Sequence, residues 1–369
     1  MLIGIDLLWV RPGLCGGTES YVRNLIEGFG TYDETNEYLL FLAKDNAETF
    51  EGCKTYKNIK TVICPVDCAK QWRRILWENL HLNRYACRYH VDMMYIPVYS
   101  KPLTIGGKIP YICVIHDLQA LHYPEYFSKA KRIFLKYAWW YSTRTATHVV
   151  PISDYGKADL IKHYPWVECK ITTIYDPVIT EASNMDFTEI GKKMNITANA
   201  YYYCVSSLLP HKNLETLLEA MSIQKKRGVI IPLVVSGVGG NKADFEAKIK
   251  QLDIEDMVIN TGFVSNEERD CLYENCKMFL FPSVFEGFGM PPIEAMRKGK
   301  RVVMTAESCL YEVTDGKAIY VKNPWDSNAW VEKMNYAETQ PEKVIGFEQY
   351  SLKVITQAFI DLFKKVKDL

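Results

Sequence analysis

The order of short apolar, β-branched runs along the chain constrains its fold most. Each run is followed by a turn and a longer stretch of helical periodicity, which is typical of βα units around a parallel sheet. The pattern is interrupted by the polar segment 176–200, which we interpret as a crossover, and then starts again. We predict an α/β fold with two doubly wound domains. The expected strands are 2–5, 38–43, 61–64, 93–96, 111–115, 148–152, 201–205, 232–236, 258–261, 278–281, 302–304 and 318–321.

Length and composition agree with two soluble domains. The chain has 369 residues, more than one core usually supports, with 48% hydrophobic and 24% charged residues. In open α/β sheets ligands bind outside the carboxyl ends of the strands. We therefore expect a ligand cleft between the two domains, with functional motifs at strand ends.

Charge and cysteine usage exclude several classes of function. Lys plus Arg and Asp plus Glu both number 44, so no global field favours nucleic acid. The 11 cysteines form no CxxC pair and no metal-ligand cluster, which predicts reduced thiols and no metal site. No apolar run reaches 18 residues, and a cytoplasmic location is expected.

The segment EGFGMPPIE, from Glu286 to Glu294, follows an expected strand directly. Gly287 and Gly289 allow a tight backbone path with exposed amides, and the two prolines after them suit a first helical turn. Amides at a helix start bind anions such as a diphosphate. The segment places Glu294 in that first turn, and carboxylates on either side of an anion site can bind sugar hydroxyls.

This segment resembles the E-x7-E motif of glycosyltransferase family four, a retaining family with the GT-B fold, in which two Rossmann-like domains face each other across a central cleft. The resemblance implies that Glu286 contacts the donor hexose and Glu294 the nucleotide ribose. It implies that the amides of Phe288, Gly289 and Met290 contact hexose and phosphates. The acceptor domain would comprise 1–176 and the C-terminal helix 347–369, and the donor domain 177–346.

A second segment, VSSLLPHKNLETLLEAM, runs from a strand end into an amphipathic helix. Lys212 lies where the chain enters that helix, so its ammonium can neutralise a departing diphosphate. The position resembles the basic residue of the family's diphosphate clamp. Where many members carry arginines, this chain has Ser207 and His211, which removes one positive charge. Two alternatives stay open: Lys212 alone compensates for the missing charge, or His211 assists it.

The first half contains two further candidate positions. Gly16 and Gly17 lie in GLCGGTES, which lacks the spacing of a dinucleotide or P-loop fingerprint. They resemble the family's glycine-rich loop against the donor phosphates. His116 ends the strand 111–115, and the resemblance places it near the anomeric carbon as a catalytic residue beside Glu286 and Lys212. Asp117 orients it or serves the structure.

Weaker signals complete the candidate site. Ser153 in PISDYG matches a family serine, but its context favours a helix N-cap. Gly262 and Phe263 in TGFV resemble the backbone that lies near the nucleobase. All these donor-binding assignments follow from the resemblance.

The resemblance also implies a mechanism. The usual account is a same-face displacement through an oxocarbenium-like state, in which the leaving phosphate accepts the acceptor's proton. It needs no metal, and no Asp-x-Asp motif occurs. We therefore expect no cofactor: the nucleotide diphosphate sugar is a substrate. Relatives with a Lys-Asn pair like 212–213 include surface-polysaccharide mannosyl- and rhamnosyltransferases, which makes GDP-mannose our first expectation and a UDP-sugar the next.

The acceptor is expected to be a saccharide or a lipid-linked saccharide. The stretches 129–148 and 71–90 mix basic and aromatic residues, as membrane-surface helices do, although a helix packed on the sheet is favoured. Peripheral contact with the inner membrane face stays open. Two alternatives also stay open: a sugar-nucleotide epimerase or phosphorylase of similar shape, and a non-catalytic two-lobed sugar-binding protein.

Overall fold

The computed structural model describes residues 1–240 and 242–368, which form two compact units. Unit 1 contains Met1–Pro177 and Glu348–Leu369, and unit 2 contains Val178–Phe347. The expected boundaries lie one residue away from these. Unit 2 is thus inserted between two parts of unit 1.

Unit 1 is built on a six-stranded sheet in the order β3-β2-β1-β4-β5-β6, in which every pair is parallel. Its strands are β1 (Leu2–Asp6), β2 (Glu37–Leu42), β3 (Ile59–Ile63), β4 (Met93–Ile96), β5 (Tyr111–Ile115) and β6 (His148–Pro151). Each expected strand of this half is present within two residues at either end. The order reverses between β1 and β4.

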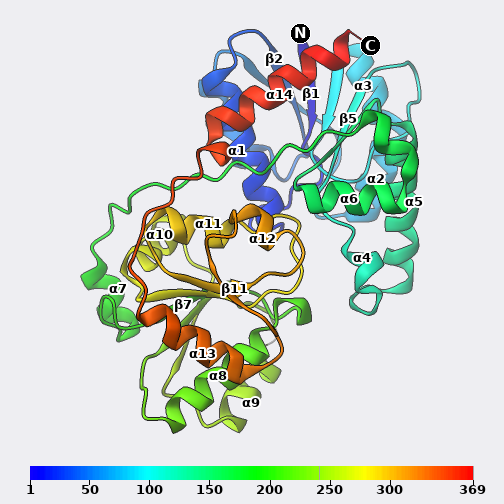
Figure 1. Cartoon of the computed structure of the whole chain (residues 1–369). Coiled ribbons are helices and arrows are strands. Elements are labelled where there is room, and N and C mark those ends of the chain that lie inside the picture. The colour runs from blue at the N-terminus through cyan, green and yellow to red at the C-terminus, as the bar shows by residue number, and fades with distance from the viewer. Residues whose placement is uncertain (241, 369) are drawn as a thin grey trace. The chain divides into compact units, whose positions relative to one another are not determined.

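Helices cover both faces of this sheet. They are α1 (Gly17–Tyr32), α2 (Gln71–Trp77), α3 (Asn83–Arg88), α4 (Gln119–His122), α5 (Lys129–Thr145), α6 (Asp154–His163) and α14 (Leu352–Lys367). The last helix, α14, packs along α1 (Figure 1). A Cβ on Gly28 of α1 would lie 2.1 Å from Thr356 Oγ1 and 2.9 Å from Leu352 Cδ1, so only glycine permits this approach. Phe29 adds ring contacts with Phe359 and Phe363.

Unit 2 has a second parallel sheet in the order β12-β11-β10-β7-β8-β9. Its strands are β7 (Tyr202–Val205), β8 (Leu233–Ser236), β9 (Val258–Gly262), β10 (Met278–Phe281), β11 (Val302–Thr305) and β12 (Ile319–Val321). All six expected strands are present. The order reverses between β7 and β10.

The helices of unit 2 lie on both sides of its sheet (Figure 1). They are α7 (Phe187–Met194), α8 (Leu214–Lys226), α9 (Ala243–Gln251), α10 (Asn266–Asn275), α11 (Met290–Arg297), α12 (Leu310–Val313) and α13 (Ser327–Glu338). A core of Leu217, Leu218, Trp330 and Met334 joins α8 and α13 to the strands. Leu214, Leu217 and Leu218 of α8 are all buried, which agrees with the amphipathic helix that the sequence predicts here.

The boundary between the two units, at Pro177 and Val178, lies within the expected crossover 176–200, and this segment also contains the helix α7. The side chain of Asp186 caps this helix, and Asn195 in the left-handed conformation ends it. Phe187, Ile190 and Met194 are spaced along one face of this eight-residue helix, so the segment does carry a short helical period, which the overall polarity of the segment obscures.

Candidate functional site

The reversal point of the second sheet brings two candidate loops together. Strands β7 and β10 are neighbours, so the loops that leave their carboxyl ends share one edge of the sheet. In doubly wound sheets, this is the position where ligands bind. The Val284 amide donates to the carbonyl of His211 over 2.8 Å, which joins the two loops directly.

The loop after β7 turns sharply into α8. Pro210–Lys212 form one 3₁₀ turn, and Asn213 adopts φ 50° before the helix begins. The Asn213 side chain donates to the Pro324 carbonyl over 2.7 Å and accepts from Thr216 over 2.7 Å. His211 is buried, and its pKa falls to about 4 because burial and then the charge of Lys212 disfavour the imidazolium. His211 is therefore neutral near pH 7.

The loop after β10 is held in place by contacts with the loop that follows the neighbouring strand β11. The Glu286 amide donates to Ser308 Oγ over 3.0 Å, and the Cys309 thiol lies 3.2 Å from the Phe288 carbonyl. Gly289 has φ 92°, a region that favours glycine, and its Cα faces Leu310. Helix α11 then starts at Met290 with a proline in its first turn, as the sequence predicts.

Lys212 and Glu286 form an ion pair across these two loops. Lys212 Nζ donates to Glu286 Oε1 over 2.7 Å, and the two side chains are 22% and 14% exposed. The pair is neutral in sum, and both groups retain access to solvent. An incoming diphosphate can therefore recruit the ammonium while a sugar hydroxyl donates to the carboxylate.

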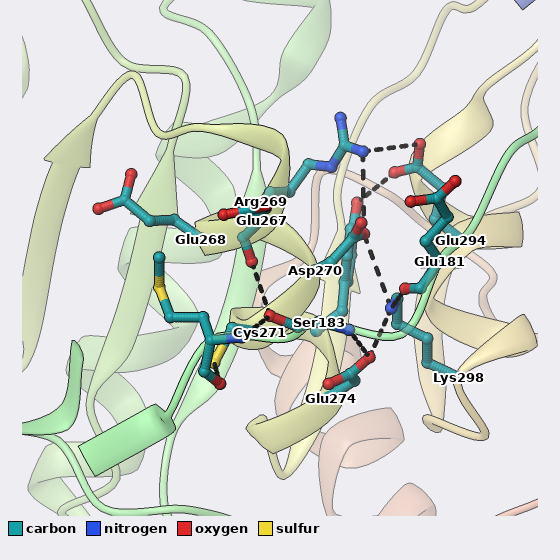
Figure 2. A network of polar contacts seen from close by, with 12 residues as sticks. Glu181, Ser183, Glu267, Glu268, Arg269, Asp270, Cys271, Glu274, Glu294 and Lys298 are labelled. Atoms are coloured by element: carbon teal, nitrogen blue, oxygen red, sulfur yellow. Dashed lines mark hydrogen bonds and ion pairs between the residues drawn. The ribbon is translucent and has the colours of Figure 1, made fainter. Parts of the chain in front are cut away.

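Glu294 lies elsewhere on α11 than the sequence suggested. It is the fifth residue of the helix, not part of the first turn, because the helix begins at Met290. Its carboxylate is buried and accepts a hydrogen bond from the Tyr273 hydroxyl over 2.9 Å. The guanidinium of Arg269 lies 3.9 Å from its other oxygen (Figure 2). Glu294 thus belongs to a buried polar network rather than to the helix dipole.

Three weaker candidates lie at other strand ends of unit 2. Ser207 is two residues beyond β7 and half-buried. Gly262 closes β9 with φ 69°, and its carbonyl accepts from the Gly237 amide over 2.7 Å. Phe263 is 76% exposed, and its ring packs where a Cβ on Gly239 would sit. An exposed aromatic ring at this edge is available to a planar ligand.

The candidates of unit 1 lie beside its own reversal point. Gly16 is the N-cap of α1, with φ 55° and open space around its Cα, and Gly17 is the first helical residue. His116 follows β5, and its Nε2 donates to the Pro97 carbonyl over 2.8 Å, since that oxygen can only accept. Its ring packs edge-on against Tyr21, with centroids 4.9 Å apart. Desolvation lowers the pKa of His116 to about 4, so it is neutral at pH 7.

Comparison with known proteins matches each unit to a family. Residues 15–182 match the family model described as Glycosyltransferase Family 4, and residues 186–354 match Glycosyl transferases group 1. The chain belongs to glycosyltransferase family four.

Two curated relatives of this glycosyltransferase are named as O-antigen chain mannosyltransferases. The O-antigen chain mannosyltransferase RfbU of Salmonella typhimurium is 27% identical over 236 residues, 64% of this chain and 63% of that protein. The O-antigen chain mannosyltransferase B of Escherichia coli is 26% identical over 261 residues, 69% and 68% of the two chains. The matched region thus spans about two thirds of each relative.

Solved structures show the same GT-B fold for this glycosyltransferase. The sucrose-phosphate synthase of Thermosynechococcus elongatus has a TM-score of 0.76 at 16% identity, with 99% of each chain covered. Anabaena HepE, solved in complex with UDP-glucose, has a TM-score of 0.74 at 18% identity and covers 99% of this chain and 100% of its own. The predicted fold class is therefore confirmed.

The described cysteines and histidines bear on metal binding in this glycosyltransferase. All 11 cysteines are free thiols. Ligand atoms of His122, Asp159 and His163 lie within 4.8 Å of one another. The imidazoles lie 2.7 and 3.4 Å from the Asp159 oxygens. These contacts join α4 to α6.

The structure also bears on the roles of Ser153 and of the stretch 129–148, for each of which the sequence left two interpretations open. Ser153 accepts from the Gly156 amide over 3.1 Å, which confirms the favoured reading as an N-cap. Helix α5 buries Leu135 and Trp139 in unit 1, which bears out packing on the protein core. In the described parts of the chain, no helix is long and apolar enough to cross a bilayer.

Sequence reasoning missed the residues that hold the two glutamates. Tyr273 and Arg269 come from α10, whose one recognisable motif, the capping box of Ser265 and Glu268, marks only where the helix begins. Ser308, which supports Glu286, is marked only by φ 54°, a property invisible in sequence. The four-residue spacing of Arg269 and Tyr273 places them on one helix face, but nothing in the chain links that face to Glu294.

Proposed function

We propose that the chain is a retaining glycosyltransferase that moves a hexose from a nucleotide diphosphate sugar to a saccharide or lipid-linked acceptor in polysaccharide assembly. The Lys212–Glu286 pair at the reversal point between β7 and β10 carries the proposal. It combines a cation for the diphosphate with a carboxylate for the sugar, next to the amides that begin α11. GDP-mannose is the first candidate donor, supported by the names of the curated relatives, and a UDP-sugar is the second.

The chemistry follows from those charges. When the bond between anomeric carbon and phosphate oxygen lengthens, negative charge develops on the diphosphate, and Lys212 stabilises it most at that stage. The acceptor hydroxyl attacks from the face that the diphosphate leaves, and its proton passes to a phosphate oxygen. The sugar keeps its anomeric configuration. No step requires a metal or cofactor, and we propose that the nucleotide sugar enters as a substrate only.

Residues of both units contribute in this proposal. Ser207, His211, Gly262 and Phe263 contact the nucleotide, and Gly287 to Met290 contact the hexose and phosphates. Gly16 and Gly17 lie against the donor phosphates, and His116 contacts the sugar from unit 1. His116 acts as a neutral hydrogen-bonding group, because its low pKa excludes a charged acid at pH 7.

The donor is tested by thermal shift with GDP-, UDP- and dTDP-sugars. A ligand at 100 times its dissociation constant adds about 2.7 kcal/mol to stability. With the donor found, NMR of the product reads its anomeric configuration. Inverted product removes the retaining mechanism. Sugar isomerised without acceptor indicates the epimerase, and binding without any product indicates the sugar-binding protein.

The two glutamates divide the work in this proposal. Glu286→Ala should leave the affinity for free nucleoside diphosphate within about threefold of wild type while sugar transfer falls, because Glu286 faces the hexose. Glu294→Ala should weaken free nucleotide by about tenfold or more, the loss of charged hydrogen bonds. Equal loss of nucleotide affinity in both variants would contradict the division.

We also propose that the exposed face of α5 contacts an anionic bilayer, where a lipid-linked acceptor would lie. Ile133, Tyr137 and Trp140 are 72%, 53% and 46% exposed, one or two turns apart on that helix. The helix contains five basic residues and no acidic one. Large exposed apolar groups among basic residues fit the surface of anionic lipids.

Vesicle co-sedimentation tests this contact. The double variant Tyr137→Ser, Trp140→Ser should bind phosphatidylglycerol vesicles several-fold less than wild type. Neutral vesicles should bind little of either protein. Trp325→Ser is the matched control, since Trp325 is 59% exposed in unit 2. Equal binding by the α5 variant and the control would rule out the contact.

A further inference from the structure

Glu294 has one oxygen fixed by a single donor. The Tyr273 hydroxyl donates to Glu294 Oε2 over 2.9 Å, and both residues are buried. Burial, and next the Glu294 charge, raise the pKa of Tyr273, so the phenol keeps its proton. An ionised carboxylate has about four acceptor positions. Tyr273 takes one of them and sets the orientation of the rest.

Arg269 lies near the other oxygen without bonding to it. Its guanidinium is 3.9 Å from Glu294 Oε1 and 3.8 Å from Asp270 Oδ1, both too long for hydrogen bonds (Figure 2). Arg269 Nε is buried with no hydrogen-bond partner. A buried N–H without a partner is costly and calls for an explanation. The charge attracts the carboxylate while leaving its hydrogen-bonding positions open.

On the side away from Glu294, the polar network continues through Asp270 to further contacts that hold it in place. Lys298 lies 3.7 Å from Asp270 and donates to Glu274 over 2.7 Å. Glu274 in turn accepts from the Ser183 amide over 2.9 Å. These contacts, visible in Figure 2, restrain the helix α10 that carries both Tyr273 and Arg269. The two side chains are therefore held against α11 from behind.

We propose that Tyr273 and Arg269 are positioning residues that hold the Glu294 carboxylate for the vicinal 2′- and 3′-hydroxyls of the donor nucleotide. Tyr273 fixes the rotation of the carboxylate, and Arg269 holds it by charge. The remaining acceptor positions of Glu294 then meet the two ribose hydroxyls together. This inference rests on the proposed function, because it needs Glu294 to bind a ribose.

The test compares a nucleoside diphosphate with its 2′-deoxy analogue by calorimetry, using GDP or UDP, whichever binds wild type more tightly. Wild type should prefer the ribonucleotide by about tenfold or more, the value of a hydrogen bond to a charged group. Tyr273→Phe removes only the hydroxyl and should reduce this preference to about threefold or less. Its affinity for the deoxy analogue should stay near that of wild type.

Tyr201→Phe is the matched control. The Tyr201 hydroxyl is also buried in unit 2 but donates to the Leu272 carbonyl, over 2.7 Å. Its loss should cost similar stability and leave the preference for ribose unchanged. The double variant Tyr273→Phe, Glu294→Gln should prefer the ribonucleotide no less than Glu294→Gln alone. Both substitutions disrupt the same arrangement of the carboxylate, so their effects should not add.

Arg269→Gln keeps the inference testable if Tyr273→Phe fails to fold. This variant should also reduce the preference for ribose. Its control is Arg301→Gln, because the guanidinium of Arg301 donates to the Ala337 carbonyl. If each variant keeps the wild-type preference like its control, the positioning role is overturned while the proposed function stands. If wild type binds no nucleoside diphosphate, the proposed function fails and this inference fails with it.

Discussion

The candidate groups at the carboxyl edges of the two sheets differ in charge, although the topologies of the sheets are alike. At the reversal point of unit 2, two ionised side chains meet, Lys212 with Glu286. At that of unit 1, the candidate group is a neutral imidazole held by a backbone carbonyl, His116. A diphosphate needs charge to bind, whereas sugar hydroxyls need only oriented hydrogen-bonding groups. Similar folds thus specialise through the loops at one edge.

The largest expected effect comes from removing the cation of unit 2. Lys212→Ala should reduce turnover by about 10²–10³, the usual loss when one stabilising donor is removed from a transition state. It should leave the fold intact, because the side chain is partly exposed. Steady-state kinetics measure this. Lys248→Ala, which removes a surface pair with Glu215, is the control and should change turnover by less than twofold.

Removing the neutral group of unit 1 should cost less. His116→Ala should lower turnover by up to about tenfold, the value of one neutral hydrogen bond. His116→Gln can still donate to the Pro97 carbonyl and should recover part of the loss. Since the pKa of His116 is about 4, the pH–rate profile of wild type between pH 6 and 8 should show no inflection from it. An inflection that disappears in His116→Gln would contradict a neutral role.

Two glycines sharpen the comparison at the backbone. Gly289→Ala should destabilise the protein by about 1–2 kcal/mol for its positive φ, and more because the new Cβ would lie 2.7 Å from Leu310 Cδ2. Gly16→Ala also has positive φ but meets no atom within 4 Å, so its cost should be about 1 kcal/mol. Urea unfolding measures both. A larger loss for Gly16→Ala would show that crowding at Gly289 is unimportant.

Acid should reduce the stability of both units. Burial lowers the pKa of His148 in unit 1 and of His211 in unit 2 to about 4, against about 6.5 when unfolded. Between these values the unfolded chain binds protons that the native chain does not, so stability falls as pH falls. His148→Gln and His211→Gln should each flatten this loss by up to about 1.4 kcal/mol per pH unit, measured as unfolding free energy from pH 6.5 to 4.5.

Sequence predicted much of the fold because its strands are short apolar runs bounded by turns. It also placed Lys212 and Glu286 at strand ends, which the parallel sheet then brings together. What it missed depends on contacts between distant segments. The ion pair of those two residues, the fifth-residue position of Glu294 on α11 and its contact with Tyr273 arise from helix starts and packing. These have no signature within any one segment.

The insertion of unit 2 into unit 1 has a consequence for synthesis on the ribosome. Helix α1 packs against α14, but residues 178–347 are made between them. At 5–20 residues per second, this delay is on the order of ten seconds or more. Throughout it, the face of α1 around Phe29 lacks its cover of Phe359 and Phe363. Unit 2 is continuous in sequence and can therefore complete its core first. A nascent chain would then need chaperone protection mainly at its N-terminal part, which belongs to unit 1.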